Sequence, residues 1–186
     1  MNISEPFSSA PVKDGRAPKE IRVYDFLEKL GIPIYGLDHD NADTMEICQV
    51  IEERLGAEIC KNLFLCNAQA SSFYLLLMPG KKPFKTKFLS KQINSSRLSF
   101  ASAENLEKYL DILPGSVSVM GLINDKEKNV KLLIDKDLLS LPEIGVHPCV
   151  NTSTLKIKTD DLMNIIIPAL GREPMLVDLP DPSEMT

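Results

Sequence analysis

The chain has 186 residues, a formal net charge of -5, 44% hydrophobic residues and 25% charged residues. This length suits about one domain with its own core, and the composition excludes collagen, a coiled coil and disorder over most of the chain. No apolar run approaches the ~18 residues of a membrane span, and residues 1–17 lack the pattern of a signal peptide. We therefore expect a cytoplasmic protein that makes no membrane contact.

The cysteines and the net charge argue against three further classes of protein: disulfide-rich, zinc-binding and duplex-DNA-binding. The four cysteines form no C-x-x-C pair, and only two histidines accompany them. A disulfide scaffold and a zinc site are both disfavoured, so we expect reduced thiols, no metal and no cofactor. The negative net charge argues against a protein that holds duplex DNA by bulk electrostatics.

The chain divides into three parts. Residues 1–17 lack apolar periodicity, which predicts a flexible N-terminal tail. The folded domain is expected over residues 18–178, followed by a C-terminal tail at 179–186. No internal repeat is present in the sequence.

The first predicted elements alternate between helix and strand. Helical spacing predicts a helix over 19–30 that Gly31 ends, followed by a strand over 32–37. Asp43 as the cap and Glu46 as its capping-box partner predict a second helix that stops at Gly56.

A hairpin and two helices are expected next. Strands over 60–66 and 72–78 flank a polar turn at 67–71. Residues 84–93 are expected to be helical and 97–100 extended, and Ser102 can cap a helix that runs to Leu110.

The C-terminal third predicts a second hairpin and a last helix. Its strands cover 117–123 and 130–134, around a turn at 124–129. A strand over 155–157, a helix capped by Thr159 that ends at Gly171 and an edge strand over 175–177 complete the chain. The irregular mixture predicts an α+β or mixed α/β fold rather than a doubly wound sheet.

A basic window lies in this otherwise acidic chain. Residues 80–97 contain no acidic residue and include Lys81, Lys82 and Lys85. Such a window is either a solvated face whose counter-charges lie elsewhere or a docking surface for a phosphate backbone.

Two local features stand out from the general pattern. Strand alternation places Lys61 on one face with Leu63 and Leu65, and a lysine on an apolar face is uncommon unless its ammonium reaches water or a partner. Between Gly145 and Pro148, His147 is expected to be extended and open to close approach. Each feature also has a purely structural explanation: a lysine that reaches solvent, and a loop histidine bonded to the backbone.

Five runs of residues, in order, carry a resemblance to a known family. They are Lys61-Asn62-Leu63-Phe64-Leu65, residues 97–102, Pro114-Gly115-Ser116-Val117, residues 121–125, and Gly145-Val146-His147-Pro148 with Asn151-Thr152. Together they resemble the YbaK/prolyl-tRNA-synthetase-associated domain family, in its branch of free-standing prolyl-tRNA editing proteins (ProX/PrdX type). The resemblance covers about residues 21–178.

The resemblance implies a fold and an activity. The implied fold is one YbaK-like domain, with a central mixed, partly barrel-like sheet surrounded by helices. The implied activity is hydrolysis of the ester of mischarged tRNA(Pro), above all Ala-tRNA(Pro). Mischarged tRNA and prolyl-tRNA synthetase are then the expected partners, and we expect a monomer.

The resemblance also implies roles for particular residues. Lys61 matches the family's essential lysine, His147 matches the histidine that shapes the amino-acid pocket, and Gly115 begins the family's G-x-x-x-P loop. Backbone amides of Gly115 and Gly121 are candidates for the oxyanion site, since glycine lets the main chain come close. The candidates for substrate binding are Asn62, Gly121 and Gly145, and those for tRNA docking are Lys81, Lys82 and Lys85. Because Asn62 faces the other way from Lys61 along an ideal strand, fixing the loop geometry is its alternative role.

Two positions depart from the family pattern. Val119 replaces the proline of the G-x-x-x-P loop, and Cys149 stands where relatives commonly have asparagine. Two other hypotheses therefore stay open: a non-catalytic module that binds aminoacyl-tRNA or prolyl groups, and a deacylase for cysteine, serine or a non-protein amino acid.

Overall fold

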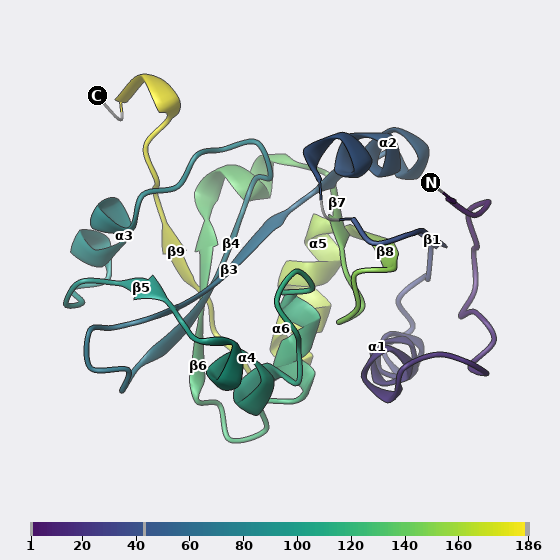
Figure 1. The fold of residues 1–186 in the computed structure, drawn as a ribbon, viewed down its shortest axis with the longest axis horizontal. Helices are drawn as coiled ribbons and strands as arrows, with labels where there is room; N and C mark the ends of the chain where they lie inside the picture. The colour runs from purple at the N-terminus through teal and green to yellow at the C-terminus, as the bar shows by residue number, and fades with distance from the viewer. Residues whose placement is uncertain (1, 43, 185–186) are drawn as a thin grey trace.

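The structure is a computed structural model that describes residues 2–42 and 44–184. Its strands form two sheets, one of four strands in the order β1-β8-β7-β2 and one of five strands in the order β5-β3-β4-β6-β9. In Figure 1 the five-stranded sheet lies on the left and the four-stranded sheet on the right, with the helices α5 (Thr159–Asp161) and α6 (Ile167–Ala169) between them. The predicted mixed α/β class is confirmed, but the strands divide between two sheets instead of forming one central sheet.

The N-terminal half matches the predicted order of elements. Helix α1 spans Pro18–Lys29, and strand β1 (Gly36–Asp38) overlaps only the last two residues of the strand expected over 32–37. Helix α2 spans Met45–Leu55; Thr44 caps it by accepting the amide of Ile47, and Gly56 ends it in the left-handed conformation. The cap predicted at Asp43 lies outside the described residues.

The first hairpin is confirmed. After the short strand β2 (Glu58–Ile59), strand β3 (Lys61–Cys66) pairs antiparallel with β4 (Phe73–Met78). Asn67 closes the turn, because its side-chain oxygen accepts the amides of Ser71 and Ser72. Helix α3 (Thr86–Gln92), strand β5 (Ser99–Phe100) and helix α4 (Ala103–Leu110) follow, and Ser102 caps α4 as predicted.

The second hairpin was predicted wrongly. The segment Val119–Ile123 is a 3-10 helix (η1), and β6 (Val130–Asp135) pairs in parallel with β4 and β9 (Met175–Val177). A short apolar run does not by itself distinguish a strand from a buried helical turn. Here Ser118 caps the turn by accepting the amide of Met120, which selects the helix.

The C-terminal elements complete both sheets. A 3-10 helix, η2 (Lys136–Ser140), leads to β7 (Glu143–Val146), a strand that the sequence analysis missed, and β7 pairs with β8 (Ser153–Lys158). The predicted last helix begins at Thr159, whose hydroxyl bonds the carbonyl of Leu141, so Thr159 is the first helical residue rather than the cap. A π-helical turn, η3 (Leu162–Ile166), joins α5 to α6. Strand β9 lies at the edge of its sheet, as expected. A last turn, η4, covers Pro182–Glu184.

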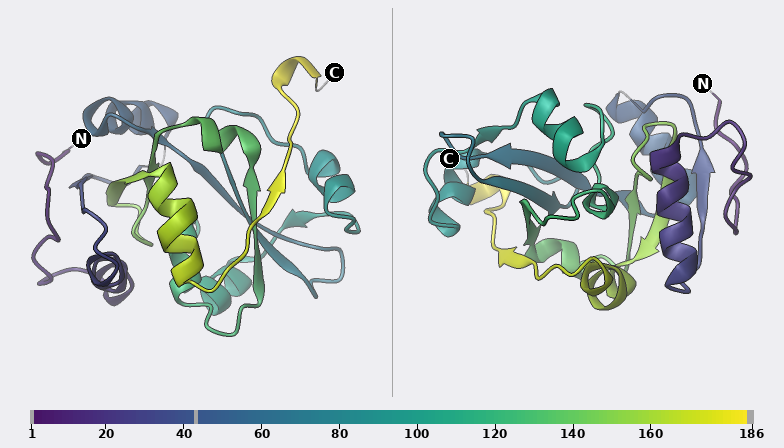
Figure 2. Two further views of the ribbon diagram at one scale, coloured as in Figure 1. Left: turned by 180° about the vertical axis from the view of Figure 1, so that it is seen from behind. Right: turned by 90° about the horizontal axis from the view of Figure 1, so that it is seen from below.

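The core lies between the two sheets. Its largest cluster takes one face of each sheet, including Phe64, Leu75 and Ile134 from one and Ile144 and Leu155 from the other. On the outer face of the five-stranded sheet, α3 buries Leu89 against a second cluster. On the outer face of the four-stranded sheet, α2 packs Ile51 and Leu55 against Leu37. Figure 2 shows the two sheets from behind and from below.

Residues at both ends of the chain contact the domain, and at the C-terminal end Leu179 is buried in the cluster on the outer face of the five-stranded sheet. The backbones of Phe7 and Gly36 exchange hydrogen bonds, and Ile3 forms a bridge with His39. Arg16 forms ion pairs with Glu20 and Asp38. The flexibility expected for these tails stays a prediction.

A buried ion pair fastens the loop after β4 to the end of β6. The side chain of Lys82 is 5% exposed, and its Nζ lies 2.9 Å from Oδ2 of Asp135 and 2.6 Å from Oδ2 of Asp137. The two carboxylates raise the pKa of Lys82 against the opposing effect of burial. The loop between β4 and α3 is therefore held by a buried ammonium that contacts one buried carboxylate, Asp135, and one exposed carboxylate, Asp137.

We expect Lys82→Met to destabilise the fold by about 3–5 kcal/mol, because it leaves the fully buried Asp135 without a counter-charge. Denaturant unfolding followed by circular dichroism measures this. Lys136→Met is the matched control: Lys136 is exposed and pairs with the exposed Asp178, so its loss should cost at most about 1 kcal/mol. Equal effects of the two substitutions would contradict the prediction.

Candidate functional site

Lys61 begins β3 and lies on the α3 side of the five-stranded sheet, with Leu63. It is half-buried, and its Nζ donates a 2.6 Å hydrogen bond to the carbonyl of Lys82. Burial lowers the pKa of the ammonium, and the nearby carboxylate of Glu58 opposes this shift. The loop that the Lys82 ion pair fastens therefore also fixes the Lys61 ammonium.

A groove of about 600 Å³ opens beside Lys61. It combines an apolar floor with cationic side chains and no acidic one; its lining residues are Lys61, Leu63, Phe84, Lys85, Thr86, Lys87 and Phe100. Such a lining attracts an anionic ligand that also has an apolar or aromatic face.

Asn62 lies on the opposite face of β3 and contacts the protein. Its Nδ2 donates to the carbonyl of Cys60 at 3.1 Å, and its Oδ1 accepts the amide of Val119 at 3.0 Å. The side chain thus fixes the start of η1, the loop in which Val119 replaces the family's proline. The geometry supports the loop-fixing role for Asn62 rather than direct contact with substrate.

The three candidate glycines differ in what surrounds them. Gly115 is exposed and has φ +90°, which disfavours any side chain there. Gly121 is buried, its amide donates to the carbonyl of Ser118 at 3.0 Å, and a Cβ would come within 2.5 Å of Ile112. Gly145 lies in β7 directly against Ile59. Of the two proposed oxyanion amides, only that of Gly115 lies in an exposed turn.

His147 directly follows β7 and lies close to a second histidine, His39. The Nδ1 of His147 lies 2.9 Å from the carbonyl of Ser153 and 3.3 Å from the hydroxyl of Thr154. The same hydroxyl lies 2.8 Å from Nε2 of His39, and the two imidazole rings are 6.2 Å apart. Burial lowers the pKa of both histidines. Sequence reasoning missed both partners. His39 lies far from His147 in the sequence, and Thr154, although only seven residues after His147, belongs to no motif that marks it.

The predicted residues fall into two groups around one junction. The amide of Cys60 donates to the carbonyl of Gly145 at 3.0 Å, which brings the start of β3 next to the strand that leads to His147. From this junction the Lys61 side chain enters the groove, while His147 turns to His39 and Thr154. The structure therefore brings the backbones together but does not place these two side chains in mutual contact.

The three lysines expected to dock tRNA have different surroundings. Lys82 is buried with its counter-charges, so it is not part of an exposed basic surface. Lys81 is exposed but lines a recess together with Glu52, Glu53 and Glu58. Lys85 is exposed at the groove beside Lys61. Sequence reasoning missed Phe84 and Phe100, the two aromatic residues that line this groove together with Lys85.

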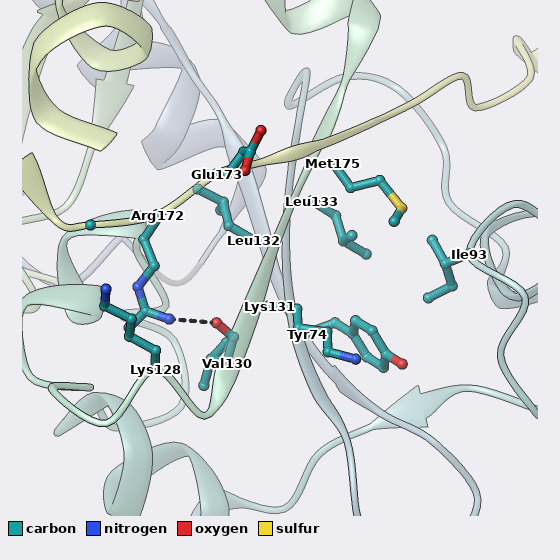
Figure 3. Close-up of a pocket in the computed structure, with 11 residues that line it drawn as sticks. Tyr74, Ile93, Lys128, Val130, Lys131, Leu132, Leu133, Arg172, Glu173 and Met175 are labelled. Atoms are coloured by element: carbon teal, nitrogen blue, oxygen red, sulfur yellow. Dashed lines mark hydrogen bonds between the residues drawn. The ribbon is translucent and has the colours of Figure 1, made fainter. Parts of the chain in front are cut away.

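A smaller pocket of about 290 Å³ lies on the same α3 side of the five-stranded sheet, but farther across it, at β6 and β9. Figure 3 shows Arg172 pointing to the carbonyl of Val130, to which it donates at 2.8 Å. The same guanidinium pairs with Asp125, and the Arg172 side chain is 6% exposed. None of the predicted site residues lines this pocket, so it is separate from the candidate site.

Within residues 2–42 and 44–184, no group of three or more His, Cys, Asp or Glu side chains is placed to hold a metal ion. Over the same residues, every helix is too short or too polar to span a membrane.

Comparisons with known proteins agree on one family. The profile of a family described as the aminoacyl-tRNA editing domain matches residues 39–165. The prolyl-tRNA editing protein ProX of Acetoanaerobium sticklandii is 34% identical over 140 residues, which cover 75% of this chain and 85% of that protein. Prolyl-tRNA synthetase associated domain-containing protein 1 of Danio rerio is 27% identical over 154 residues, 81% of this chain and 83% of the relative.

A solved structure shares the fold. It is described as a candidate trans-editing enzyme for prolyl-tRNA synthetase and superposes with a TM-score of 0.68 at 20% identity. The superposition covers 90% of this chain and 99% of that structure.

The lowered pKa values of His39 and His147 predict that the stability of the fold depends on pH. Their pKa values are lowered in the folded state, although Asp38 and Asp40 partly oppose this for His39. The unfolded chain then binds more protons below about pH 6.5, so stability falls as pH drops from about 7.5 to about 5.5. Thermal melting across this range should show a flatter profile for the double variant His39→Gln, His147→Gln than for the parent. Parallel profiles would contradict the assignment.

Proposed function

The chain belongs to the aminoacyl-tRNA editing domain family, and on that premise we propose that it removes alanine from mischarged tRNA(Pro), in trans and as a monomer. Its reaction class is the hydrolysis of an aminoacyl ester on tRNA. The observation that carries the proposal is the half-buried Lys61 ammonium, fixed by the Lys82 carbonyl at the side of a cationic groove that no acidic residue lines.

The reaction makes modest demands on the protein. An aminoacyl ester is already activated, so water can attack its carbonyl carbon without a metal or a covalent nucleophile. The C–O bond to the ribose then breaks, the ribose oxygen takes one proton of the water, the other proton is released to solvent, and the amino acid leaves as its carboxylate. The protein must orient the ester and stabilise the negative charge that develops on its carbonyl oxygen.

Lys61 and Gly115 are the groups proposed for these tasks. Hydrogen bonding to the Lys82 carbonyl uses one of the three ammonium donors of Lys61 and leaves two for the terminal phosphate or the ester. The backbone amide of Gly115 is the proposed donor to the oxyanion, and a hydroxyl of the substrate ribose orients the water. His147 bounds the amino-acid pocket.

The need for such an enzyme follows from the size of its substrates. A prolyl-tRNA synthetase must hold proline, and alanine is smaller and still fits. The apolar contacts that alanine loses are worth only ~1–3 kcal/mol, so a second and smaller pocket must remove the error. Prolyl-tRNA synthetase is therefore the proposed source of the substrate.

We expect Lys61→Ala to slow deacylation of Ala-tRNA(Pro) by roughly 10²–10³-fold, the loss typical of one preorganised charge-stabilising donor. Release of alanine under single-turnover conditions measures the rate, and circular dichroism checks the fold. Lys158→Ala, an exposed lysine in β8, is the control and should keep the parent rate. A parent chain that binds the tRNA but releases no alanine would favour the non-catalytic binding module.

We expect His147→Ala to change the order in which the enzyme prefers alanine, serine, cysteine and larger amino acids. Removing the imidazole enlarges the pocket, so the larger amino acids should gain relative to alanine. A deacylation panel across mischarged tRNAs measures the order. An unchanged order across the panel would leave His147 a structural residue, bonded to Ser153 and Thr154.

We also expect the double variant Lys81→Gln, Lys85→Gln to bind tRNA more weakly and with a lower salt dependence. Each lost phosphate contact lowers the slope of log affinity against log salt by about one unit. Lys85 should contribute more than Lys81, whose carboxylate neighbours repel phosphates. Titrations at several salt concentrations test this, and an unaltered slope would move the docking surface elsewhere on the molecule.

A further inference from the structure

Phe100 is an exposed aromatic residue in an unusual position. Its side chain is 64% exposed, and it lies on β5, the edge strand of the five-stranded sheet, opposite Leu65 of β3. A phenylalanine left this open loses the free energy that burial would supply. The fold itself gains little from this ring, which raises the question of what it contacts.

The surroundings of Phe100 indicate the chemistry of a ligand. The ring shares its groove with the half-buried Phe84 and with the ammonium groups of Lys61, Lys85 and Lys87. A groove that joins aromatic faces to positive charge suits a single-stranded nucleic acid, whose bases stack on rings while its phosphates pair with cations. An apolar peptide would use the rings but not the lysines.

We propose that this groove holds the unpaired 3′ nucleotides of the tRNA, with a base stacked on Phe100 and with Lys85 and Lys87 at the phosphates. The proposal rests on the proposed function, because it brings the ester at the 3′ end to Lys61. It goes beyond that function by assigning a stacking residue and a path for the strand along β3.

The dimensions agree with this path. Four residue steps separate Lys61 from Leu65, the partner of Phe100, which at ~3.3 Å per residue is about 13 Å. Stacked nucleotides rise ~3.4 Å each, so this length accommodates roughly four of them. A strand that enters over Phe100 can therefore reach the Lys61 ammonium with its last nucleotide.

The test is a binding titration of the full chain with an RNA hairpin that ends in an unpaired 3′ overhang, with 2-aminopurine as the terminal base. Phe100→Ala should raise Kd by about 5- to 150-fold, which corresponds to ~1–3 kcal/mol for one stacked base. Phe100→Tyr should restore the affinity, and Phe100→Leu, which is apolar without a ring, should not. Met175→Ala removes a 51% exposed side chain from β9, at the opposite edge of the sheet, and should change nothing.

Three comparisons separate base stacking from charge, from binding of the RNA duplex and from catalysis. Phe100→Ala should lower affinity without changing the salt slope, whereas Lys85→Gln with Lys87→Gln should lower the slope. A blunt hairpin without the overhang should bind the parent and Phe100→Ala equally. If the hairpin binds through Phe100 but no mischarged tRNA is hydrolysed, the proposed function fails and the groove assignment stands.

The proposal is overturned if Phe100→Ala binds the overhang as the parent does, or if Phe100→Leu restores binding. It is also overturned if the loss is equal for the blunt hairpin. A groove that ignores RNA and binds apolar peptides instead would assign this surface to a protein partner.

Discussion

The hydrogen bond from the Cys60 amide to the Gly145 carbonyl is the contact on which the site depends. At Cys60 the chain leaves the four-stranded sheet through β2 and enters the five-stranded sheet through β3. Gly145 lets the two segments lie this close, since a Cβ there would stand 3.0 Å from the Ile59 side chain. The junction fixes where β3 begins, and therefore on which faces Lys61 and Asn62 emerge. The two adjacent residues therefore have different roles. The ammonium of Lys61 points to the groove, and the side-chain amide of Asn62 holds the loop at Val119.

Elements whose own residues mark them could be predicted from the sequence, whereas elements that depend on residues elsewhere in the chain could not. Helices α1, α2 and α4 and the β3–β4 hairpin carry their own periodicity, caps and turn residues, so they were predicted with errors of a few residues. The segment at Val119–Ile123 was predicted wrongly because its preference for a helical turn comes from Ser118 and Asn62 rather than from its apolar pattern. Strand β7 was missed because burial on both faces removes the alternation that marks a strand.

The site shows the same division between local and distant causes. The alternation of β3 correctly predicted Lys61 on an apolar face, and strand geometry correctly separated it from Asn62. The burial of Lys82 could not be predicted, because its partners Asp135 and Asp137 lie more than fifty residues away in the chain. In the sequence Lys82 was one of several lysines in a basic window, and only the fold distinguishes it from the exposed Lys85.

The segment that precedes α1 has a consequence for how the protein behaves at high concentration. Strand β1 is an edge of the four-stranded sheet, and an open edge offers unpaired amides and carbonyls to any other extended chain. Phe7 exchanges both of its backbone hydrogen bonds with Gly36, and Ser4 donates its amide to the carbonyl of Asp38. The first residues of the chain thereby occupy the positions that a second molecule would need for edge-to-edge pairing. By pairing with β1, these residues disfavour self-association of the sheet edge. This effect is independent of the chemistry at Lys61.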